Sequence, residues 1–337
     1  MESPVEPLRI GVLGAARISS LSIVSPAKAT GHRLVAIAAR DRGRAEQFAA
    51  EHGVERVVDS YDDLLSDPEI DVIYNPLPNG LHGPWNVRAL QAGKHVLSEK
   101  PSASNAAEAL EVQQEVAAGA TTFMEAFHYL FHPLTQRLLE VVESGELGRI
   151  QRAETMVAIP APPDGDPRWS LELAGGAVMD LGCYSLHAQR MLGSLLGGST
   201  TVVSASAGTR AGHPDVDEWL SADLALPGGV TGSARCHMAH DQVEMTFRVV
   251  GSDGEVVAHN FVQPHLDDRL TVTTGAGSRT EALGRRSSYT YQLEAFAAAV
   301  RTGSALPIDA ADAVSNMQLI DAAYQAAGLP PRPTSRL

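Results

Sequence analysis

The first 125 residues alternate short apolar runs with helical patterns, and few polar residues interrupt the runs. Strands that helices cover on both faces show such runs, which is typical of parallel sheets. We expect strands over 8–13, 33–39, 71–74, 95–97 and 121–125. We expect helices that end near residue 29 and that span 41–52, 85–90 and 105–118. This alternation predicts an α/β fold around a parallel sheet.

The pattern changes after a helix expected over 134–142 and the turn at Ser144-Gly145. Strand candidates then follow one another, separated by turn residues such as Pro227-Gly228-Gly229. They span 149–159, 201–207, 218–225, 230–236, 243–250 and 255–259, and helices over 289–301 and 309–327 close the chain. We therefore expect a second, antiparallel sheet and a domain boundary between residues 126 and 127.

Composition limits the classes of partner. A chain of 337 residues is long enough for two domains, and its net charge of -14 argues against nucleic acid or an anionic membrane as the main partner. Two cysteines are too few for a disulfide framework or a cysteine-based zinc site, and we expect no metal. The acidic start at 1–7 does not resemble a secretory leader, and no apolar stretch approaches the ~20 residues of a membrane span. We expect a cytoplasmic protein.

A nucleotide-binding turn is expected after the first strand. Gly14 stands at the first position of a Gly-x-Gly-x-x-Gly pattern, whereas Ala16 and Ser19 replace the other two glycines. Gly14 permits a tight turn, Ala16 still permits close backbone approach, and the helix start offers N–H donors to a pyrophosphate. A strand-turn-helix without a nucleotide is an equally good interpretation of this segment alone.

The end of the second strand distinguishes NADP from NAD. NAD sites usually place an acid here for the ribose 2′-hydroxyl, but this chain has alanine there, followed by Arg40 and Arg44. Two arginines can bind a 2′-phosphate, so we predict NADP over NAD. Two alternatives stay open: Asp41 could bind the ribose, or both arginines could belong to a solvated helix start.

Candidates for proton transfer come from two distant segments. Lys100, one of only three lysines, follows the strand at 95–97, at the carboxyl edge where open α/β sheets bind ligands. Asn79 and His82 follow the preceding strand at the same edge and could contact ribose or nicotinamide. Asp180, Tyr184 and His187 share one face of the helix that Gly175 and Gly176 open.

A tyrosine needs a nearby cation to act as a base, because its ordinary pKa is about 10. We expect Lys100 to lower the pKa of the Tyr184 phenol. Two alternatives stay open: Lys100 could form a structural ion pair with Glu99, and Tyr184 could serve in core packing.

Three motifs carry a resemblance to a known family: Gly-Lys-His-Val-Leu-Ser-Glu-Lys-Pro at 93–101, Asn-Gly-Leu-His at 79–82, and Gly-Gly-Ala-Val-Met-Asp-Leu-Gly-Cys-Tyr at 175–184. Over nearly its whole length the chain resembles the glucose–fructose oxidoreductase/inositol dehydrogenase/rhizopine catabolism (Gfo/Idh/MocA) family. Arg168-Trp169 and a tyrosine at 184 are similar to the branch of dihydrodiol and NADP-dependent xylose dehydrogenases. His128 and Leu130 depart from that branch, which usually has methionine and arginine there.

The resemblance implies a doubly wound Rossmann domain at 1–126 that binds the dinucleotide. It implies an α+β domain at 127–337 with a large, mostly antiparallel open sheet, which binds substrate and forms a homodimer or a dimer-based tetramer. Lys100 and Tyr184 would form the acid/base pair, and Asp180 would line the substrate site. The residues expected at the cofactor are Gly14, Ala15, Ala16, Arg17, Ile18, Arg40, Arg44, Leu77, Asn79, His82, Glu99, Lys100, Arg168 and Trp169.

These observations predict an NADP(H)-dependent oxidoreductase. It would transfer hydride between nicotinamide and a secondary alcohol or hemiacetal carbon of a sugar or sugar-like vicinal diol, with Asp180 and His187 as candidates to bind the diol. Three alternatives share the fold: an NAD-dependent glycosidase, a sugar–sugar oxidoreductase with a tightly bound cofactor, and a non-catalytic dinucleotide-sensing regulator.

Overall fold

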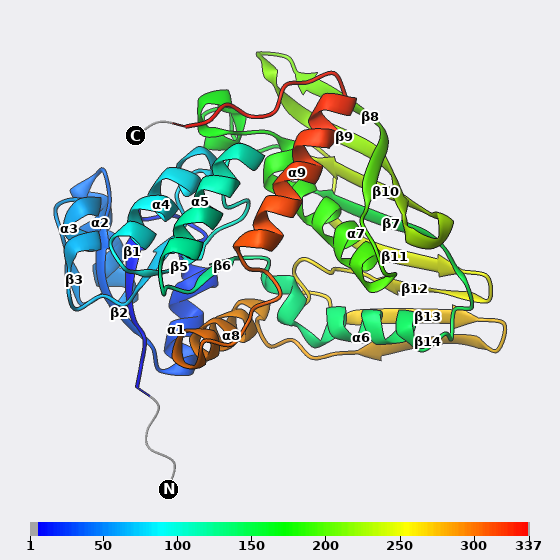
Figure 1. Ribbon diagram of the computed structural model, residues 1–337, viewed down its shortest axis with the longest axis horizontal. Helices are drawn as coiled ribbons and strands as arrows, with labels where there is room; N and C mark the ends of the chain where they lie inside the picture. Colours follow the sequence, from blue (N-terminus) through cyan, green and yellow to red (C-terminus); the bar gives the residue numbers. More distant parts are fainter. Residues whose placement is uncertain (1–5, 336–337) are drawn as a thin grey trace, which may run out of the picture.

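A six-stranded parallel sheet forms the first half of the chain in the computed structural model, which describes residues 6–335 (Figure 1). Its strand order is β3-β2-β1-β4-β5-β6, the order of a doubly wound dinucleotide-binding sheet, so the predicted Rossmann architecture is confirmed. The strands are β1 (Arg9–Leu13), β2 (Arg33–Ala38), β3 (Arg56–Val57), β4 (Val72–Asn75), β5 (His95–Ser98) and β6 (Phe123–Glu125). Most of the acidic start at 1–7 and the end of the 127–337 segment lie outside the described residues.

Capping side chains set where several helices around this sheet begin. Asp41, Ser60 and Asn105 each accept a hydrogen bond from a backbone N–H three residues later. These N–H groups in the first turn have no acceptor within the helix itself. The helices are α1 (Ser25–Thr30), α2 (Arg42–His52), α3 (Tyr61–Ser66), α4 (His82–Gln91) and α5 (Ala106–Ala118), with a π-helix at Ser20–Val24 and a 3₁₀ turn at Asn79–Leu81. The sequence did not predict β3 or α3, which are short.

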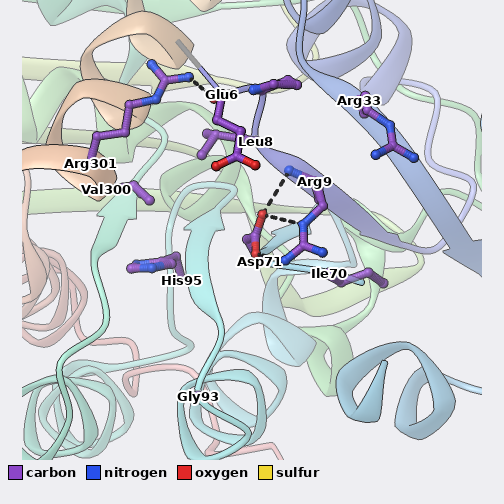
Figure 2. A pocket seen from close by; sticks show the side chains of 11 residues that line it. Glu6, Leu8, Arg9, Arg33, Ile70, Asp71, Gly93, His95, Val300 and Arg301 are labelled. Carbon is purple, nitrogen blue, oxygen red and sulfur yellow. Dashed lines mark hydrogen bonds and ion pairs between the residues drawn. The ribbon is translucent and has the colours of Figure 1, made fainter. Parts of the chain in front are cut away.

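Figure 2 shows a hollow at the amino edge of this sheet, lined in part by Arg9, Asp71 and His95. Arg9 donates from Nε to a carboxylate oxygen of Asp71 at 2.9 Å, which ties the start of β1 to the start of β4. Arg301 donates to the backbone oxygen of Glu6 at 2.8 Å and anchors the chain before β1. The candidate chemistry lies at the opposite, carboxyl edge, because Lys100 follows the end of β5.

An eight-stranded sheet forms the second layer, in the order β14-β13-β12-β11-β7-β10-β9-β8. All neighbours are antiparallel except β7 and β10, which confirms the predicted mostly antiparallel sheet. The strands are β7 (Ile150–Ala158), β8 (Thr201–Arg210), β9 (His213–Leu226), β10 (Val230–His237), β11 (Glu244–Gly251), β12 (Gly254–Ala258), β13 (Arg269–Thr274) and β14 (Gly277–Ala282). The sequence did not predict β13 and β14, whose polar, threonine- and serine-containing runs lack a continuous apolar pattern.

Helices join the two sheets into one body. Helix α7 (Cys183–Leu195) packs on β7 and β10, and α9 (Ala310–Ala326) lies between α5 and α7 (Figure 1). Helix α8 (Ser288–Thr302) returns to pack against α1, whereas α6 (Pro133–Glu143) packs on β12 and β13. Shorter 3₁₀ turns lie at His128–Phe131, Pro167–Trp169, Leu171–Leu173 and Pro227–Gly229, and a π-helix lies at Val178–Gly182. None of the helices within residues 6–335 has the length and apolar character that a bilayer crossing requires.

The chain end fastens the segment that carries Asp180 and Tyr184. Arg332 is fully buried and pairs with the equally buried Asp217, which also accepts hydrogen bonds from Tyr324 (3.0 Å) and from the backbone N–H of Val178 (2.7 Å). The carbonyl oxygen of Arg332 accepts a hydrogen bond from Asn105 at 2.9 Å. The last described residues therefore hold the start of the Val178–Gly182 turn against the first half of the chain.

Removing this guanidinium would leave a buried carboxylate without its cation. We predict that Arg332→Ala lowers the free energy of unfolding by about 3–5 kcal/mol, the usual cost of breaking a buried ion pair from one side. Urea denaturation measures it. Arg42→Ala serves as the control, because Arg42 is exposed on α2, where ion pairs contribute about 0–1 kcal/mol. Equal effects of the two substitutions would contradict the role assigned to Arg332.

Candidate active site

Lys100 and Asp180 bring the two halves of the chain together. Lys100 Nζ donates to the backbone oxygen of Asp180 at 2.8 Å and lies 3.3 Å from its carboxylate oxygen Oδ1. Their side chains are only 12% and 16% exposed, so water screens the pair weakly. The structure thus brings together two residues, 80 positions apart, that the sequence proposed for one site.

Both members of the pair are charged. Burial acts to raise the pKa of Asp180, but the cations of Lys100 and Arg168 outweigh it, and the pKa lies below its ordinary value. Burial acts to lower the pKa of Lys100, but Asp180 outweighs it, with Cys183 and Glu99 adding to the effect, and this pKa is raised. The site therefore presents an ammonium and a carboxylate at neutral pH.

Tyr184 lies beside this pair, but its pKa moves opposite to the prediction. Lys100 Nζ lies 5.0 Å from the centre of the tyrosine ring, and Phe127 and Tyr129 pack edge-on against the same ring. Burial raises the pKa of the phenol well above 10, and the nearby Tyr289 and Glu99 add to the rise. The predicted net lowering of this pKa is thus wrong for this structure, because desolvation outweighs the attraction of the Lys100 ammonium. Tyr184 is a protonated phenol here.

A chain of ion pairs continues from Asp180 to the nucleotide-binding turn. Arg168 Nε lies 2.8 Å from Asp180 Oδ2, and Arg168 also approaches Asp166, 3.5 Å away. Asp166 lies 3.0 Å from Arg17, whose side chain is 81% exposed in the turn after β1. Arg168 and Arg17, both expected at the cofactor, thus line one path across the two halves of the chain.

Trp169 is fixed within the same loop. Its indole N–H donates to the backbone oxygen of Pro162 at 3.2 Å, and its ring stacks on His213 with 5.4 Å between centres. The Arg210 guanidinium lies 4.8 Å from the ring centre. The indole is buried among these groups, and its expected contact with the cofactor stays a prediction.

The turn after β1 has the donors that a pyrophosphate needs. Gly14 adopts a left-handed backbone with φ of +79°, and its N–H donates to Ala38. Within residues 6–335, no hydrogen bond engages the N–H groups of Ala15, Ala16, Arg17 or Ile18. Consecutive free N–H groups ahead of a helix suit an anionic phosphate, so these residues fit a dinucleotide.

The two arginines after β2 differ from their neighbour Arg42. Arg42 is paired with Glu46 and Asp59. Within the described part of the chain, Arg40 and Arg44 form no ion pair, and Arg44 donates only to the backbone oxygen of Ala15 at 3.1 Å. Asp41, the alternative ribose ligand, caps α2 by accepting from the Arg44 backbone N–H at 3.1 Å. Two unpaired, exposed guanidiniums are thus available for a phosphate.

The residues predicted at the carboxyl edge of β4 occupy more buried positions. His82 is 1% exposed, and its Nδ1 lies 2.6 Å from the backbone oxygen of Pro101, directly after Lys100. Burial lowers the pKa of His82 to about 4, so the ring is neutral and Nδ1–H donates. Asn79 donates to Ala174 at 3.3 Å, and Leu77 lies beside Gly14. These contacts position the chain around the site.

Glu99 forms no ion pair with Lys100 among the described contacts. Its carboxylate accepts a hydrogen bond from the Tyr74 hydroxyl at 2.8 Å, behind the sheet edge. Burial raises its pKa. The structural ion pair that the sequence offered as an alternative for Lys100 therefore forms with Asp180 instead.

Comparison with known proteins gives the family. Residues 8–127 match "Oxidoreductase family, NAD-binding Rossmann fold", and residues 135–257 match "GFO/IDH/MocA C-terminal domain". The chain belongs to the Gfo/Idh/MocA family of oxidoreductases. Residues 128–134, between the two matches, carry His128 and Tyr129, which lie against Tyr184.

Relatives span nearly the whole chain. D-xylose 1-dehydrogenase (NADP(+)) 2 of Haloferax volcanii is 38% identical, over 95% of this chain and 97% of its own length. Trans-1,2-dihydrobenzene-1,2-diol dehydrogenase of Mus musculus is 34% identical, over 73% of each chain. The crystal structure of KijD10, a 3-ketoreductase from Actinomadura kijaniata in complex with NADP and TDP-benzene, has a TM-score of 0.88 and 28% identity, over 95% of this chain and 98% of its own.

The helix face predicted for this Gfo/Idh/MocA protein holds for two of its three residues. Asp180 lies in the π-helix Val178–Gly182, and Tyr184 is the second residue of the α-helix that follows, α7. His187 instead bonds to the Tyr129 hydroxyl at 2.7 Å and to Asp312 at 3.1 Å, and its ring stacks on Phe127. His187 is therefore wrong as a candidate to bind a diol in this structure, because these contacts bury it.

Sequence reasoning missed the groups that surround Tyr184 from other segments. His128 Nε2 lies 3.3 Å from the Tyr184 hydroxyl, and Tyr289 packs on the His128 ring. Only His128 gave a signal, as a departure from the usual segment of the resembling branch. Tyr289 comes from α8, more than 100 residues later, and nothing in its local pattern points to this site.

Glu125 is a buried carboxyl group at the end of β6. It lies close enough to Cys183 to raise the pKa of that thiol. One oxygen accepts a hydrogen bond from the Ser102 N–H at 2.7 Å, and the other has no partner. Burial raises its pKa to about 7, and Asp312 adds to the rise. The folded protein therefore keeps this proton between about pH 4.5 and pH 7, where an unfolded glutamate has lost it.

Stability should consequently fall as pH rises through this window, because folding then requires a proton from solvent. We predict that Glu125 costs the protein about 3 kcal/mol by pH 8 relative to pH 4.5, and that Glu125→Gln removes this part of the pH dependence. Urea unfolding at both pH values measures it, with Glu111→Gln on the exposed face of α5 as the control. Parallel pH dependences of wild type and Glu125→Gln would contradict the assignment.

Proposed function

We propose that this chain is an NADP(H)-dependent oxidoreductase acting on a secondary alcohol, hemiacetal or corresponding carbonyl carbon of a sugar or sugar-like vicinal diol. The observation that carries this proposal is the meeting of Lys100, Asp180 and Tyr184 at the carboxyl edge of a dinucleotide-binding sheet. Relatives named for xylose, for a dihydrodiol and for ketoreduction support the substrate class.

Each residue of the site has a separate role in the proposed reaction. NADPH, when bound, supplies the hydride. Tyr184 is protonated, so it can donate its proton to a carbonyl oxygen as that oxygen gains negative charge. The Lys100 ammonium favours the phenolate left behind, and the Asp180 carboxylate can accept hydrogen bonds from neighbouring hydroxyls of the substrate. In the oxidising direction Tyr184 must first lose its proton.

The site would favour a polyhydroxylated substrate. Asp180 is 16% exposed and already receives Lys100 and Arg168, yet a carboxylate has acceptor sites for further donors. A vicinal hydroxyl beside the reacting carbon would supply such a donor. A simple ketone would leave that acceptor unused, so positioning would be poorer.

The proposal includes the oligomeric state of the protein and its location in the cell. We expect a homodimer or a dimer-based tetramer through the eight-stranded sheet, on which β8 keeps exposed residues along its whole length. A cytoplasmic location, the domain division at 126/127, and the Tyr184, Lys100 and Asp180 roles likewise stand as proposals.

The arginines after β2 give a test of cofactor choice. We predict that Arg40→Ala combined with Arg44→Ala lowers kcat/KM for NADP(H) about 10- to 100-fold, the value of charge-assisted hydrogen bonds to a phosphate, and changes kcat/KM for NAD(H) by less than about threefold. Steady-state kinetics with both cofactors measures it. Arg42→Ala is the matched control, because its guanidinium is already paired. Equal losses with both cofactors would contradict the 2′-phosphate assignment.

Tyr184→Phe tests the function itself. We predict that it lowers kcat about 10²- to 10⁴-fold on the best substrate of a sugar and diol panel, while fluorescence titration finds NADPH binding nearly unchanged. Near wild-type turnover by Tyr184→Phe would show that the proposed proton donor is wrong.

The pH dependence gives a second readout of the same group. Because the pKa of Tyr184 lies above 10, the phenolate fraction grows with pH throughout the neutral and alkaline range. We predict that kcat for oxidation rises by up to about tenfold per pH unit between pH 7 and 10, while kcat for reduction stays level. The residual activity of Tyr184→Phe should lack that slope.

A further inference from the structure

His128 connects the candidate proton donor to a second, fully buried hydroxyl. His128 Nε2 lies 3.3 Å from the Tyr184 hydroxyl, and Nδ1 lies 2.8 Å from Ser288 Oγ. His128 and Ser288 are both 0% exposed. The Tyr289 ring packs on the imidazole, with 3.7 Å between centres, and holds its plane. The three hydrogen-bonding groups come from three separate segments, the turn after β6, α7 and α8.

The imidazole is neutral, so it carries one proton. Burial lowers the pKa of His128 well below its ordinary value, and the neighbouring His265, Lys100 and His132 act in the same direction. A neutral imidazole donates from one nitrogen and accepts at the other. His128 therefore donates in one of its two hydrogen bonds and accepts in the other. The surroundings of the Ser288 hydroxyl determine which nitrogen donates.

The Ser288 hydroxyl forms one hydrogen bond within residues 6–335, the one to His128 Nδ1. If Nδ1–H donated to Ser288 Oγ, the serine proton would be buried without an acceptor, which costs roughly 1–3 kcal/mol. The opposite arrangement leaves the Tyr184 proton unpaired instead, but Tyr184 keeps 5% exposure whereas Ser288 is 0% exposed, so an unpaired proton costs less on the tyrosine. The favoured arrangement therefore has Ser288 donating to Nδ1. The imidazole proton then resides on Nε2 and points at the Tyr184 oxygen.

The direction of these hydrogen bonds determines how Tyr184 can use its proton. Its oxygen receives the N–H of His128, and its own proton has no other acceptor in the described part of the chain, so it is free for a substrate. Resting on the proposed function, we infer that Ser288 and His128 are positioning residues that keep the Tyr184 proton directed at a carbonyl oxygen and stabilise the phenolate formed when that proton leaves. The phenolate regains a proton from water before the next turnover.

Other charged and titratable groups face the same tyrosine and must be constant in any comparison. They are Glu99 and Lys100 after β5, Tyr129 after β6, Asp180 and Cys183 on its own segment, and Tyr289 on α8. Since none of them bonds to the tyrosine oxygen, substitutions at His128 and Ser288 act on that oxygen specifically.

The direction of the bonds can be measured without turnover. Protein labelled with ¹⁵N-histidine is examined by long-range ¹H–¹⁵N NMR at pH 7, and the signals absent from His128→Gln identify His128. The inference expects a neutral ring protonated at Nε2, and a mixture of tautomers in Ser288→Ala. A ring protonated at Nδ1, or an imidazolium, would overturn it. This readout holds even if no substrate is turned over, which would instead overturn the proposed function.

Kinetics then test the consequence. Glutamine can place an amide N–H near the position of Nε2, whereas leucine cannot. We predict that His128→Leu lowers kcat for reduction about 10- to 100-fold with KM for NADPH nearly unchanged, and lowers kcat for oxidation by about tenfold or more throughout pH 7–10, where the phenolate is the minor form. His128→Gln should restore most of both effects, and Ser288→Ala should lie between Leu and wild type.

If His128 had a merely structural role, Leu and Gln would lower the rates alike, which would overturn the inference. His95→Gln is the matched control. His95 lies at the amino end of β5, on the opposite edge of the sheet, and its Nδ1 likewise accepts a hydrogen bond, from the backbone N–H of Thr122. Its kcat in both directions should equal that of wild type.

Discussion

The pairing of the Lys100 ammonium with Asp180 is the interaction on which the site depends. Lys100 is placed by the end of β5, and Asp180 by a π-helix that leads into α7, so neither element can move without disturbing the other. Arg168 adds a second cation to the same carboxylate. A buried charge is costly unless it is paired, and this cluster satisfies that requirement between the two halves of the chain.

The same cluster determines what Tyr184 can do. The cations are bound to Asp180 rather than to the phenol oxygen, and burial then keeps the phenol protonated. A proton donor is thereby ready for a carbonyl, while the reverse reaction requires a prior deprotonation. The buried Asp217–Arg332 pair fixes the segment that carries Asp180 and Tyr184, because Asp217 accepts a hydrogen bond from the N–H of Val178 at its start.

Much of the fold could be predicted because its signals are local. Near-continuous apolar runs identified five strands of the parallel sheet, and turn residues identified most of the antiparallel one. Strands β13 and β14 were missed because polar residues fill much of both, and their pairing in the sheet, β13 with β12 and β14 with β13, specifies them instead. Lys100 could be placed at the carboxyl edge because parallel strands end there, which is a rule of topology. Its meeting with Asp180 was expected from the chemistry of the two residues and from the family resemblance.

Other features of the site depend on contacts that no local pattern contains. The π-helix at Val178–Gly182 and the bonds from Tyr129 and Asp312 turned His187 away from its predicted role. The balance between burial and charge at Tyr184 required the positions of Phe127, Tyr129 and Tyr289. His128 and Ser288 meet across 160 residues, so their hydrogen bond could not be predicted from spacing.

Whether the ammonium and the phenol act as one unit is most directly measured by a double-mutant cycle on kcat/KM with Lys100→Met and Tyr184→Phe. Groups that share one transition state are strongly non-additive, so the double variant should be no slower than the slower single variant, to within about threefold. Losses that multiply, as they do for residues acting independently, would contradict a joint Lys100–Tyr184 site.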